Sequence, residues 1–462
     1  MSACAFLPCP GITRGQKFKL WDVTYNSVAL ELKIDKLVYG GEGLARLPAN
    51  EQGRGKAVFL PLVLEGERVD CTLIEQKPGY ARGGVQRIVE PSRHRMQPVC
   101  PYFGRCGGCH YQHSNYEHQL EIKAAILKES LRRIAKLDLA RNLEVHPSAP
   151  WNYRNRTRLR VQTAPQFALG YNRLGSCQLE PVEQCPISSA LINRAISASW
   201  TLGRGALSEA AVREIEFFAD AADSRLLLEI YVHGRGNNQA IAVAERIRSA
   251  LPEVSGVSLF PAPQPSAVST EHRAALATSG ARALEYSLGA LKYRVSAGSF
   301  FQSNRHLTAE LVEIVTAGRS GGTAMDLYAG VGLFSTPLAA RFEQVIAVES
   351  SPECFADLQH NLPKNGKPTM RTVESYLTTA PRDGGADLIV VDPPRGGLGQ
   401  RIAARLSTFR APRLVYVSCD PATLARDLIP LLGAGYQVER AHLVDLFPQT
   451  FHIESVLHLV KQ

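Results

Sequence analysis

Three reactive side chains stand at the ends of short apolar segments. Cys419 ends the segment LVYVSC, and Asp392 ends DLIVVD, where Pro393 prevents the strand from continuing. Glu454 begins the segment ESVLHLVK. A thiol between a strand and a helix can have a lowered pKa and act as a thiolate, whereas most buried cysteines are inert. We predict that Cys419 is a nucleophile and that Glu454 is a general base facing the same cleft, rather than a surface charge.

This set of side chains suits methyl transfer to C5 of a pyrimidine. C5 is too weakly nucleophilic to take a methyl group from a sulfonium unaided, but a thiolate that adds to C6 makes C5 reactive. A base must afterwards remove the C5 proton so that the thiolate can leave. A base stacked in RNA is out of reach, so the target must be extruded or already single-stranded.

A glycine turn provides a candidate site for the methyl donor. In MDLYAGVG, a strand runs into Gly330 and Gly332, and the next strand, VIAVE, ends in Glu349. An acid at this position suits the two hydroxyls of a ribose. The three-glycine pyrophosphate fingerprint is missing, which favours S-adenosylmethionine over NAD. A plain tight turn is the alternative.

A cysteine-rich loop predicts a metal centre. Cys100, Cys106 and Cys109 have the spacing C-x5-C-x2-C, and Cys185 is the expected fourth ligand, with Cys177 as its competitor. Four thiolates suit either zinc or an iron–sulfur cluster. Zinc sites commonly pair two CxxC motifs, whereas here the fourth cysteine is single and distant, which favours the cluster.

The positive charge of the chain is concentrated in one stretch. Residues 81–175 contain 16 lysines and arginines against 6 aspartates and glutamates, although the whole chain has a net charge of +9. Within it, Arg154, Arg156, Arg158 and Arg160 alternate along one expected strand, so they share a face. We predict that this row contacts RNA phosphates; a solvated edge strand guarded by charge is the alternative.

The pattern of elements predicts three parts and an α/β fold. Residues 1–14 form an extension, 15–92 a small β-barrel, 93–290 a central α/β domain that carries the cysteines, and 291–462 a doubly wound parallel sheet. The last two strands have a short connection, which favours an antiparallel pair. A helix is expected over Tyr116–Leu137. Its predicted apolar face is Leu120, Ala124, Leu127, Leu131 and Ile134.

The composition is that of a folded soluble protein. Of the 462 residues, 45% are hydrophobic and 21% are charged. No apolar run is long enough for a transmembrane helix, and the first residues lack the features of a signal peptide. We therefore expect a cytoplasmic protein without membrane contact, and a monomer.

Four motifs resemble one enzyme family. DLYAGVG, DPPRGG, VSCDPATLARD and FPQTFHIE together are similar to the RNA 5-methyluridine (uracil-C5) methyltransferases. The resemblance implies a class I (Rossmann-like) methyltransferase domain in which Cys419 is the nucleophile and Glu454 the proton-abstracting base. It also implies that Gln302, Tyr328, Glu349 and Asp392 contact S-adenosylmethionine. For Asp392 it implies a uracil contact as well. Ala329 stands where many relatives have cysteine, a position that is not catalytic.

The resemblance extends to the rest of the chain. LKIDKLVYGGEGLAR resembles the TRAM domain, a small RNA-binding barrel of the OB-like type. The spacing of Cys100, Cys106, Cys109 and Cys185 resembles that of members with a [4Fe-4S] cluster. Members with both features mostly act on large-subunit (23S) ribosomal RNA, so this RNA is the expected substrate.

Three alternatives remain open at this point. The substrate could be a transfer RNA uridine. The chain could be a non-catalytic RNA-binding iron–sulfur protein, against which the intact Cys419 and Glu454 argue. It could also methylate an exocyclic nitrogen through Asp-Pro-Pro, and such an enzyme would need no nucleophilic thiol.

Overall fold

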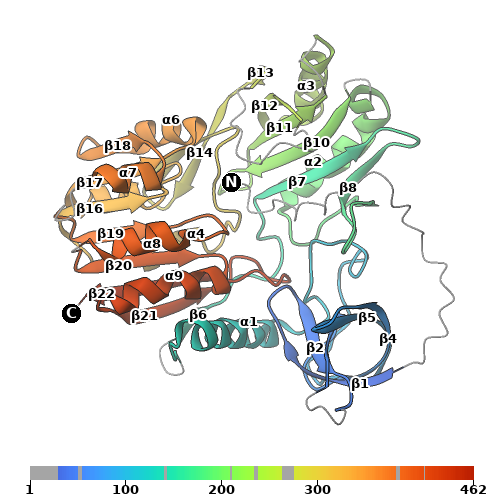
Figure 1. The fold of residues 1–462 in the computed structure, drawn as a ribbon. Coiled ribbons are helices and arrows are strands. Elements are labelled where there is room, and N and C mark those ends of the chain that lie inside the picture. The colour runs from blue at the N-terminus through green and yellow to red at the C-terminus, as the bar shows by residue number, and fades with distance from the viewer. Residues whose placement is uncertain are drawn as a thin grey trace.

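The computed structural model contains three β structures, which lie apart in Figure 1: a closed barrel, a seven-stranded sheet and an eight-stranded sheet. The residues that the structure describes are 30–49, 55–139, 143–208, 211–233, 238–262, 275–380, 385–409 and 411–461. The extension expected over residues 1–14 lies outside these ranges.

The barrel confirms the small β structure expected near the N-terminus. Its strands are β1 (Leu30–Leu37), β2 (Glu42–Arg46), β3 (Ala57–Pro61), β4 (Arg68–Gln76) and β5 (Tyr80–Glu90). They close in the order β1-β2-β3-β5-β4. Along β2 and β3, every second residue is buried, because alternate side chains of a strand point to opposite faces. The inward side chains, such as Val58 and Leu60, form a core of their own.

The seven-stranded sheet lies between the barrel and the C-terminal part in sequence. Its order is β13-β12-β11-β10-β7-β8-β9. The strands are β7 (Arg156–Gln162), β8 (Ala168–Asn172), β9 (Leu179–Pro181), β10 (Val212–Ala219), β11 (Leu226–Val232), β12 (Val254–Pro261) and β13 (Ala277–Gly280). Two helices, α2 (Ala190–Leu202) and α3 (Asn238–Ala250), share its hydrophobic core. The hairpin of β14 (Ala283–Leu288) and β15 (Leu291–Ser296) follows.

The eight-stranded sheet has the order β18-β17-β16-β19-β20-β22-β21-β6. Its strands are β6 (Leu143–His146), β16 (Gly321–Leu327), β17 (Phe342–Glu349), β18 (Gly366–Met370), β19 (Leu388–Val391), β20 (Arg413–Ser418), β21 (Tyr436–Val444) and β22 (Glu454–Lys461). The strands from β18 to β20 are parallel, and β22 pairs antiparallel with both β20 and β21. The expected parallel sheet with an antiparallel end is therefore confirmed.

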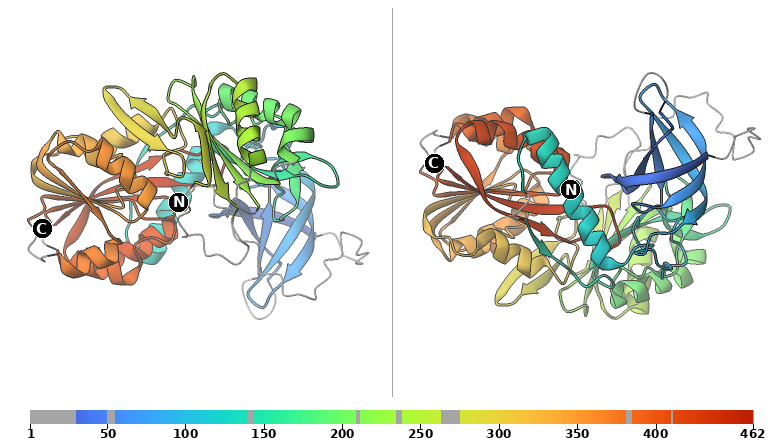
Figure 2. Two further views of the ribbon diagram at one scale, coloured as in Figure 1. Left: turned by 90° about the horizontal axis from the view of Figure 1, so that it is seen from above. Right: turned by 90° about the horizontal axis from the view of Figure 1, so that it is seen from below.

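Helices cover both faces of this sheet, as the two views of Figure 2 show. They are α4 (Thr308–Thr316), α5 (Ser335–Ala339), α6 (Pro352–Asn361), α7 (Val373–Thr379), α8 (Gly399–Ser407) and α9 (Pro421–Gly433). Successive residues of β19 belong to two different cores: Ile389 packs in one and Val390 in the other. Burial on both faces explains why the strands are continuous apolar runs. No helix in the described part of the chain is long and apolar enough to cross a membrane.

The eight-stranded sheet also includes chain from outside the expected range 291–462. β6 pairs in parallel with β21, and α1 (Tyr116–Ser130) packs against α9 in a shared core. The helix confirms the prediction, and a π-helical turn continues it over Leu131–Ala135.

The predicted face of α1 is wrong in part. Its buried residues are Gln119, Ile122, Lys123, Ile126 and Leu127, whereas Ile134 beyond its end is 40% exposed. Two polar side chains are buried there because they bind the loop between β21 and β22.

Candidate active site

Strand register brings Cys419 and Glu454 together. The last pair between β20 and β22 is Ser418 with Ser455, and the Ser455 hydroxyl donates to the Ser418 carbonyl at 3.3 Å. Cys419 and Glu454 lie one residue beyond this pair, at the edge where β19 ends and Asp392 follows. The charges of the Glu454 and Asp392 carboxyls act on the pKa of the Cys419 thiol, as expected for groups in one cleft.

The thiol pKa is opposite to the sequence prediction. Burial raises the pKa of Cys419, and the carboxyls of Glu454 and Asp392 raise it further. Arg395 lowers it, but this effect is smaller. The prediction of a lowered pKa is therefore wrong for the free protein.

The helix that follows Cys419 does not offset this effect. Asp420 is the N-cap of α9, and its Oδ1 accepts the N–H groups of Ala422 at 3.0 Å and Thr423 at 2.9 Å. The amides that stabilise an anion at a helix N-terminus are thus already bound to a carboxylate. The charge of Asp420 itself raises the thiol pKa.

The neighbouring carboxyls are unusually basic. Burial raises the pKa of Glu454 well above its ordinary value, and the charge of Asp392 raises it further. Burial, followed by the charge of Asp326, raises the pKa of Asp392 to about 7. A carboxylate whose pKa approaches the working pH is a better proton acceptor than an exposed one.

The glycine turn and its acid form one unit. After β16, Tyr328, Gly330 and Gly332 have positive φ angles of 74°, 56° and 93°. Such an angle is uncommon for tyrosine and costs backbone strain, which is often found at functional sites. The Oε2 of Glu349 accepts the N–H of Gly330 at 2.8 Å, and its Oε1 accepts the N–H of Ser351 at 2.6 Å. The turn is therefore held against the end of β17.

A buried acid beside this turn has a free acceptor atom. The Oδ2 of Asp326 accepts the Ser335 hydroxyl at 2.5 Å, whereas its buried Oδ1 has no hydrogen-bond partner. Burial raises the pKa of Asp326 to about 7. Both features suit a cationic ligand, which would favour the ionised acid.

Gln302 is buried in the segment that joins β15 to α4. The hydroxyl of Ser299, three residues earlier, donates to Asp357 of α6 at 2.7 Å. Gln302 thus follows a segment that contacts the helix after Glu349.

The four predicted cysteine ligands lie together. The charge of Cys185 acts on the pKa of Cys100, Cys106 and Cys109, although burial is the largest cause of the raised pKa of these three thiols. The Sγ of Cys106 also accepts the N–H of Gly108 at 3.4 Å.

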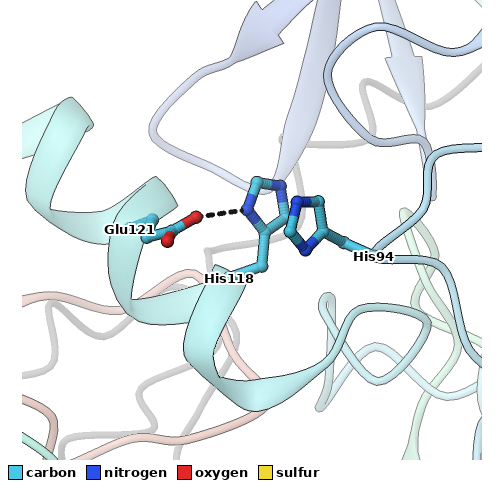
Figure 3. A group of neighbouring side chains, drawn as sticks. All are labelled: His94, His118 and Glu121. Carbon is cyan, nitrogen blue, oxygen red and sulfur yellow. Dashed lines mark hydrogen bonds and ion pairs between the residues drawn. The ribbon is translucent and has the colours of Figure 1, made fainter.

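Two histidine–glutamate groups in the described part of the chain have ligand atoms that all lie within 4.8 Å of one another. In the first, His94 stacks on His118 with ring centroids 4.0 Å apart, and the Nδ1 of His118 contacts Glu121 at 2.8 Å (Figure 3). The in-plane lone pairs of two stacked parallel rings lie in separate planes and do not converge on one metal ion. The group instead joins the segment after the barrel, which carries His94, to α1.

The second group joins β6 to β21. The Nε2 of His146 lies 2.9 Å from the Nδ1 of His442, and the Nδ1 of His146 lies 2.6 Å from Glu310. Its carboxylate, Glu144, is bound by Arg440 at 3.2 Å. These contacts form a proton-sharing network beside a fixed positive charge, which disfavours a metal ion.

Three arginines of the row lie on one face of β7, as predicted, and Arg154 precedes the strand. Arg156 is buried, and Arg158 is half-buried. Arg156 donates to Glu216 at 2.5 Å and to Glu229 at 3.0 Å, and Arg158 donates to Glu216 at 2.6 Å. Burial alone would raise the pKa of Glu216, but the two arginines lower it to about 2. Arg154 is buried as well.

Carboxylates of neighbouring strands neutralise Arg156 and Arg158, which argues against phosphate contacts by these two residues. Their network holds the segment before Gln302 instead: Arg156 donates to the carbonyl of Ser299 at 2.5 Å. Arg160 is less buried and donates to Asn172 at 2.7 Å.

Sequence reasoning missed two residues of the site. Arg395 is the cation that acts on the pKa of both Cys419 and Glu454. Its position directly after Asp-Pro-Pro was a usable signal. Tyr39, from the barrel, donates its hydroxyl to the carbonyl of Cys419 at 3.0 Å. No local pattern could connect residues so far apart in the chain.

Known proteins are similar to this chain in sequence and in fold. Residues 115–374 and 383–462 match the family described as tRNA (Uracil-5-)-methyltransferase, and residues 25–85 match the TRAM domain. The 23S rRNA (uracil(1939)-C(5))-methyltransferase RlmD of Shewanella amazonensis is 31% identical over 441 residues, which are 93% of this chain and 95% of that protein. A protein of Aquifex aeolicus, named an uncharacterized RNA methyltransferase, is 31% identical over 92% of this chain and 97% of its own.

A solved structure has the same fold. The tRNA (uracil-54, C5)-methyltransferase of Pyrococcus abyssi, in complex with S-adenosyl-L-homocysteine, has a TM-score of 0.70 at 21% identity and covers 93% of this chain and 100% of its own. Because the family match covers residues 115–374 and 383–462, which are most of the chain, this protein belongs to the tRNA (uracil-5-)-methyltransferase family, whose members transfer a methyl group to uracil C5 in RNA.

Proposed function

We propose that this enzyme methylates C5 of one uridine in 23S ribosomal RNA, with S-adenosylmethionine as donor. The observation that carries the chemistry is the meeting of Cys419 and Glu454 at one sheet edge, beside the glycine turn. The choice of RNA is supported by the Shewanella relative, whose name states this substrate. A transfer RNA uridine, the substrate in the name of the Pyrococcus enzyme, is the second candidate.

In the proposed reaction, Cys419 adds to C6 of the extruded uracil. Its proton passes to Asp392, whose pKa of about 7 leaves it partly ionised at neutral pH, so that Glu454 stays free to accept the C5 proton later. The C6–S bond forms, and the electrons of the C5–C6 double bond move toward C5 and O4. C5 then attacks the methyl group, and S-adenosylhomocysteine leaves.

The second half of the reaction restores the enzyme. Glu454 takes the C5 proton, the C5–C6 double bond re-forms, and the C6–S bond breaks. Cys419 then recovers a proton. Arg395 favours each anionic state in this series of steps, because its positive charge lowers the pKa of both Cys419 and Glu454.

The residues around the turn fit the methyl donor. We propose that Tyr328, Gly330, Gly332, Glu349 and Gln302 hold its nucleoside and amino-acid parts. Asp326 and Asp392 would face its positive charge, which the buried and unpartnered Oδ1 of Asp326 suits. When bound, the donor supplies an electrophilic methyl group.

Binding of S-adenosylmethionine should strengthen between pH 6 and 8. A cationic ligand binds the ionised forms of Asp326 and Asp392, whose pKa is about 7, so affinity is lost as pH falls and these acids take protons. For one such group the expected change is about tenfold. Calorimetric titration at several pH values measures it.

S-adenosylhomocysteine, which lacks the sulfonium charge, is the control ligand and should show a weaker dependence. The Asp326→Asn variant should flatten the profile of the sulfonium ligand. Equal pH profiles for both ligands would contradict a role for these acids in charge recognition.

We further propose that Cys100, Cys106, Cys109 and Cys185 hold a [4Fe-4S] cluster. The support for it is that four thiols from two distant segments of the chain lie near one another. In this division of labour, the barrel (15–92) binds RNA, the central part (93–290) holds the cluster, and the C-terminal part (291–462) carries out the transfer.

Methyl transfer to purified RNAs tests the function. The protein and labelled donor are incubated with unmodified 23S ribosomal RNA or transfer RNA, and digests are analysed by mass spectrometry. We expect 5-methyluridine at one position of the ribosomal RNA. Label in transfer RNA alone would show that the substrate is a transfer RNA and not ribosomal RNA. Label on an exocyclic nitrogen would overturn the C5 reaction.

A further inference from the structure

The barrel contributes a side chain to the active site. Tyr39 lies at the tip of the hairpin between β1 and β2, and its hydroxyl donates to the carbonyl of Cys419 at 3.0 Å. This carbonyl lies one residue beyond the last pair of β20 with β22. The contact joins parts of the chain that are 380 residues apart. The nucleophile is therefore tied to the barrel through its own backbone.

The hairpin turn is shaped for this position. The N–H of Val38 donates to Glu42 at 2.9 Å, and Gly40 and Gly41 have φ angles of +108° and +86°. A Cβ atom on Gly41 would lie 3.0 Å from the Cβ of His110. Glycine thus permits both the backbone angle and the close approach to the loop that follows Cys109.

Aromatic contacts hold Tyr39 from the side. Its ring meets Phe451 edge to face at a centroid distance of 5.4 Å, and the His110 ring also meets Phe451, at a centroid distance of 4.6 Å. The backbone N–H of His110 donates to the carbonyl of Gln449 at 2.8 Å. Figure 1 shows the loop between β21 and β22, which carries Phe451 and Gln449, reaching from the sheet toward the barrel. The three segments therefore meet at Cys419.

The Tyr39 hydroxyl stays protonated in this setting. Burial raises its pKa, and the charges of Asp420 and Cys419 raise it further. It therefore remains a hydrogen-bond donor throughout the pH range in which the enzyme works.

We propose that Tyr39 is a positioning residue, which holds the Cys419 backbone so that the thiol faces C6 of the target base, and that it thereby couples the RNA-binding barrel to the nucleophile. This inference rests on the proposed function for its catalytic consequence. Its geometric basis, the hydrogen bond between the barrel and the nucleophile's carbonyl, is independent of the RNA substrate. RNA held by the barrel and the attacking sulfur would then share one rigid frame.

The Tyr39→Phe variant tests the proposal, because it removes the hydroxyl and keeps the ring. We expect covalent capture of RNA containing 5-fluorouridine to slow about two- to tenfold, the loss that one neutral hydrogen bond produces. RNA affinity and S-adenosylmethionine affinity should stay unchanged, so the effect falls on kcat and not on KM. Tyr80→Phe is the matched control, since this barrel tyrosine packs on Phe59 and is not part of the site.

A second measurement separates this inference from the proposed function. The rate at which iodoacetamide alkylates Cys419 in the protein alone, followed by mass spectrometry of its peptide, requires no RNA. In Tyr39→Phe, alkylation should be faster than in wild type and in Tyr80→Phe, because the thiol is no longer held in its buried orientation.

The outcomes distinguish the two proposals. If Tyr39→Phe changes the alkylation rate of Cys419 but the wild-type protein methylates no RNA, the proposed function is wrong and the positioning contact is supported. Wild-type rates of both alkylation and capture in Tyr39→Phe would overturn the positioning role. A loss confined to RNA affinity would also overturn it, and would make Tyr39 an RNA contact.

Discussion

Replacing Cys419 with alanine should abolish methyl transfer and any covalent RNA–protein species. Without the thiol, C5 of uracil is not activated, so the expected loss is on the order of 10⁴-fold or more, as for removal of other catalytic nucleophiles. RNA containing 5-fluorouridine measures the first step directly, because the fluorine at C5 cannot leave as a proton and the adduct persists. Wild-type protein should give a band of reduced mobility on a denaturing gel, and Cys419→Ala should give none.

Glu454→Gln should stop the same reaction at a later point. The variant still adds to C6 and methylates C5, but the C5 proton remains and the C6–S bond cannot break. It should therefore accumulate a methylated, covalently linked RNA with ordinary uridine. Turnover should fall by about 10²- to 10⁴-fold, the usual contribution of a general base. Adduct formation by Cys419→Ala, or normal turnover by Glu454→Gln, would show that the assignment of roles is wrong.

Loss of a cysteine from the predicted cluster should remove the iron and lower the activity. His110 and Tyr111, the two residues after Cys109, donate their N–H groups to the carbonyl of Gln449 at 2.8 and 3.0 Å. The chain continues from Gln449 to Glu454, so a disordered cysteine loop would release the segment that leads to the base. A displacement of about 1 Å in a reacting group costs on the order of 10²-fold in rate.

The Cys109→Ala variant measures this connection. Wild-type protein purified without oxygen should be brown and contain about four irons per chain, whereas the variant should be colourless and about 10²-fold less active. S-adenosylmethionine should still bind, because the glycine turn lies on other strands. Cys71→Ala, in the buried core of the barrel, is the control. Stoichiometric zinc in colourless wild-type protein would show that the four cysteines hold a mononuclear zinc site and not a cluster.

The motifs at the strand ends could be located from sequence because their signals are local. An apolar run followed by Asp-Pro-Pro, by Ser-Cys-Asp or by a glycine turn marks the edge of a parallel sheet wherever it occurs. The structure places Asp392, Cys419 and the turn at Gly330 after β19, β20 and β16. The antiparallel end of the sheet followed from the short link between its last strands.

Predictions that concerned neighbours were less successful. The alternation of arginines correctly indicated a shared face on β7, but periodicity does not show what lies against that face. There, Glu216 and Glu229 come from two other strands and neutralise Arg156 and Arg158. On α1, the buried Lys123 contacts Asp445 at 2.5 Å, a partner 322 residues away, so an apolar stripe could not identify the buried face.

The sequence by itself determined which residue types can perform the reaction and which strands end at them, because these features depend on a few adjacent residues. Only the tertiary structure decided how these groups behave. The raised pKa of Cys419 depends on burial and on carboxyls from other strands, and its hydrogen bond to Tyr39 depends on how the barrel sits against the sheet. Desolvation and charge act through space, so they become defined only when remote segments are packed together.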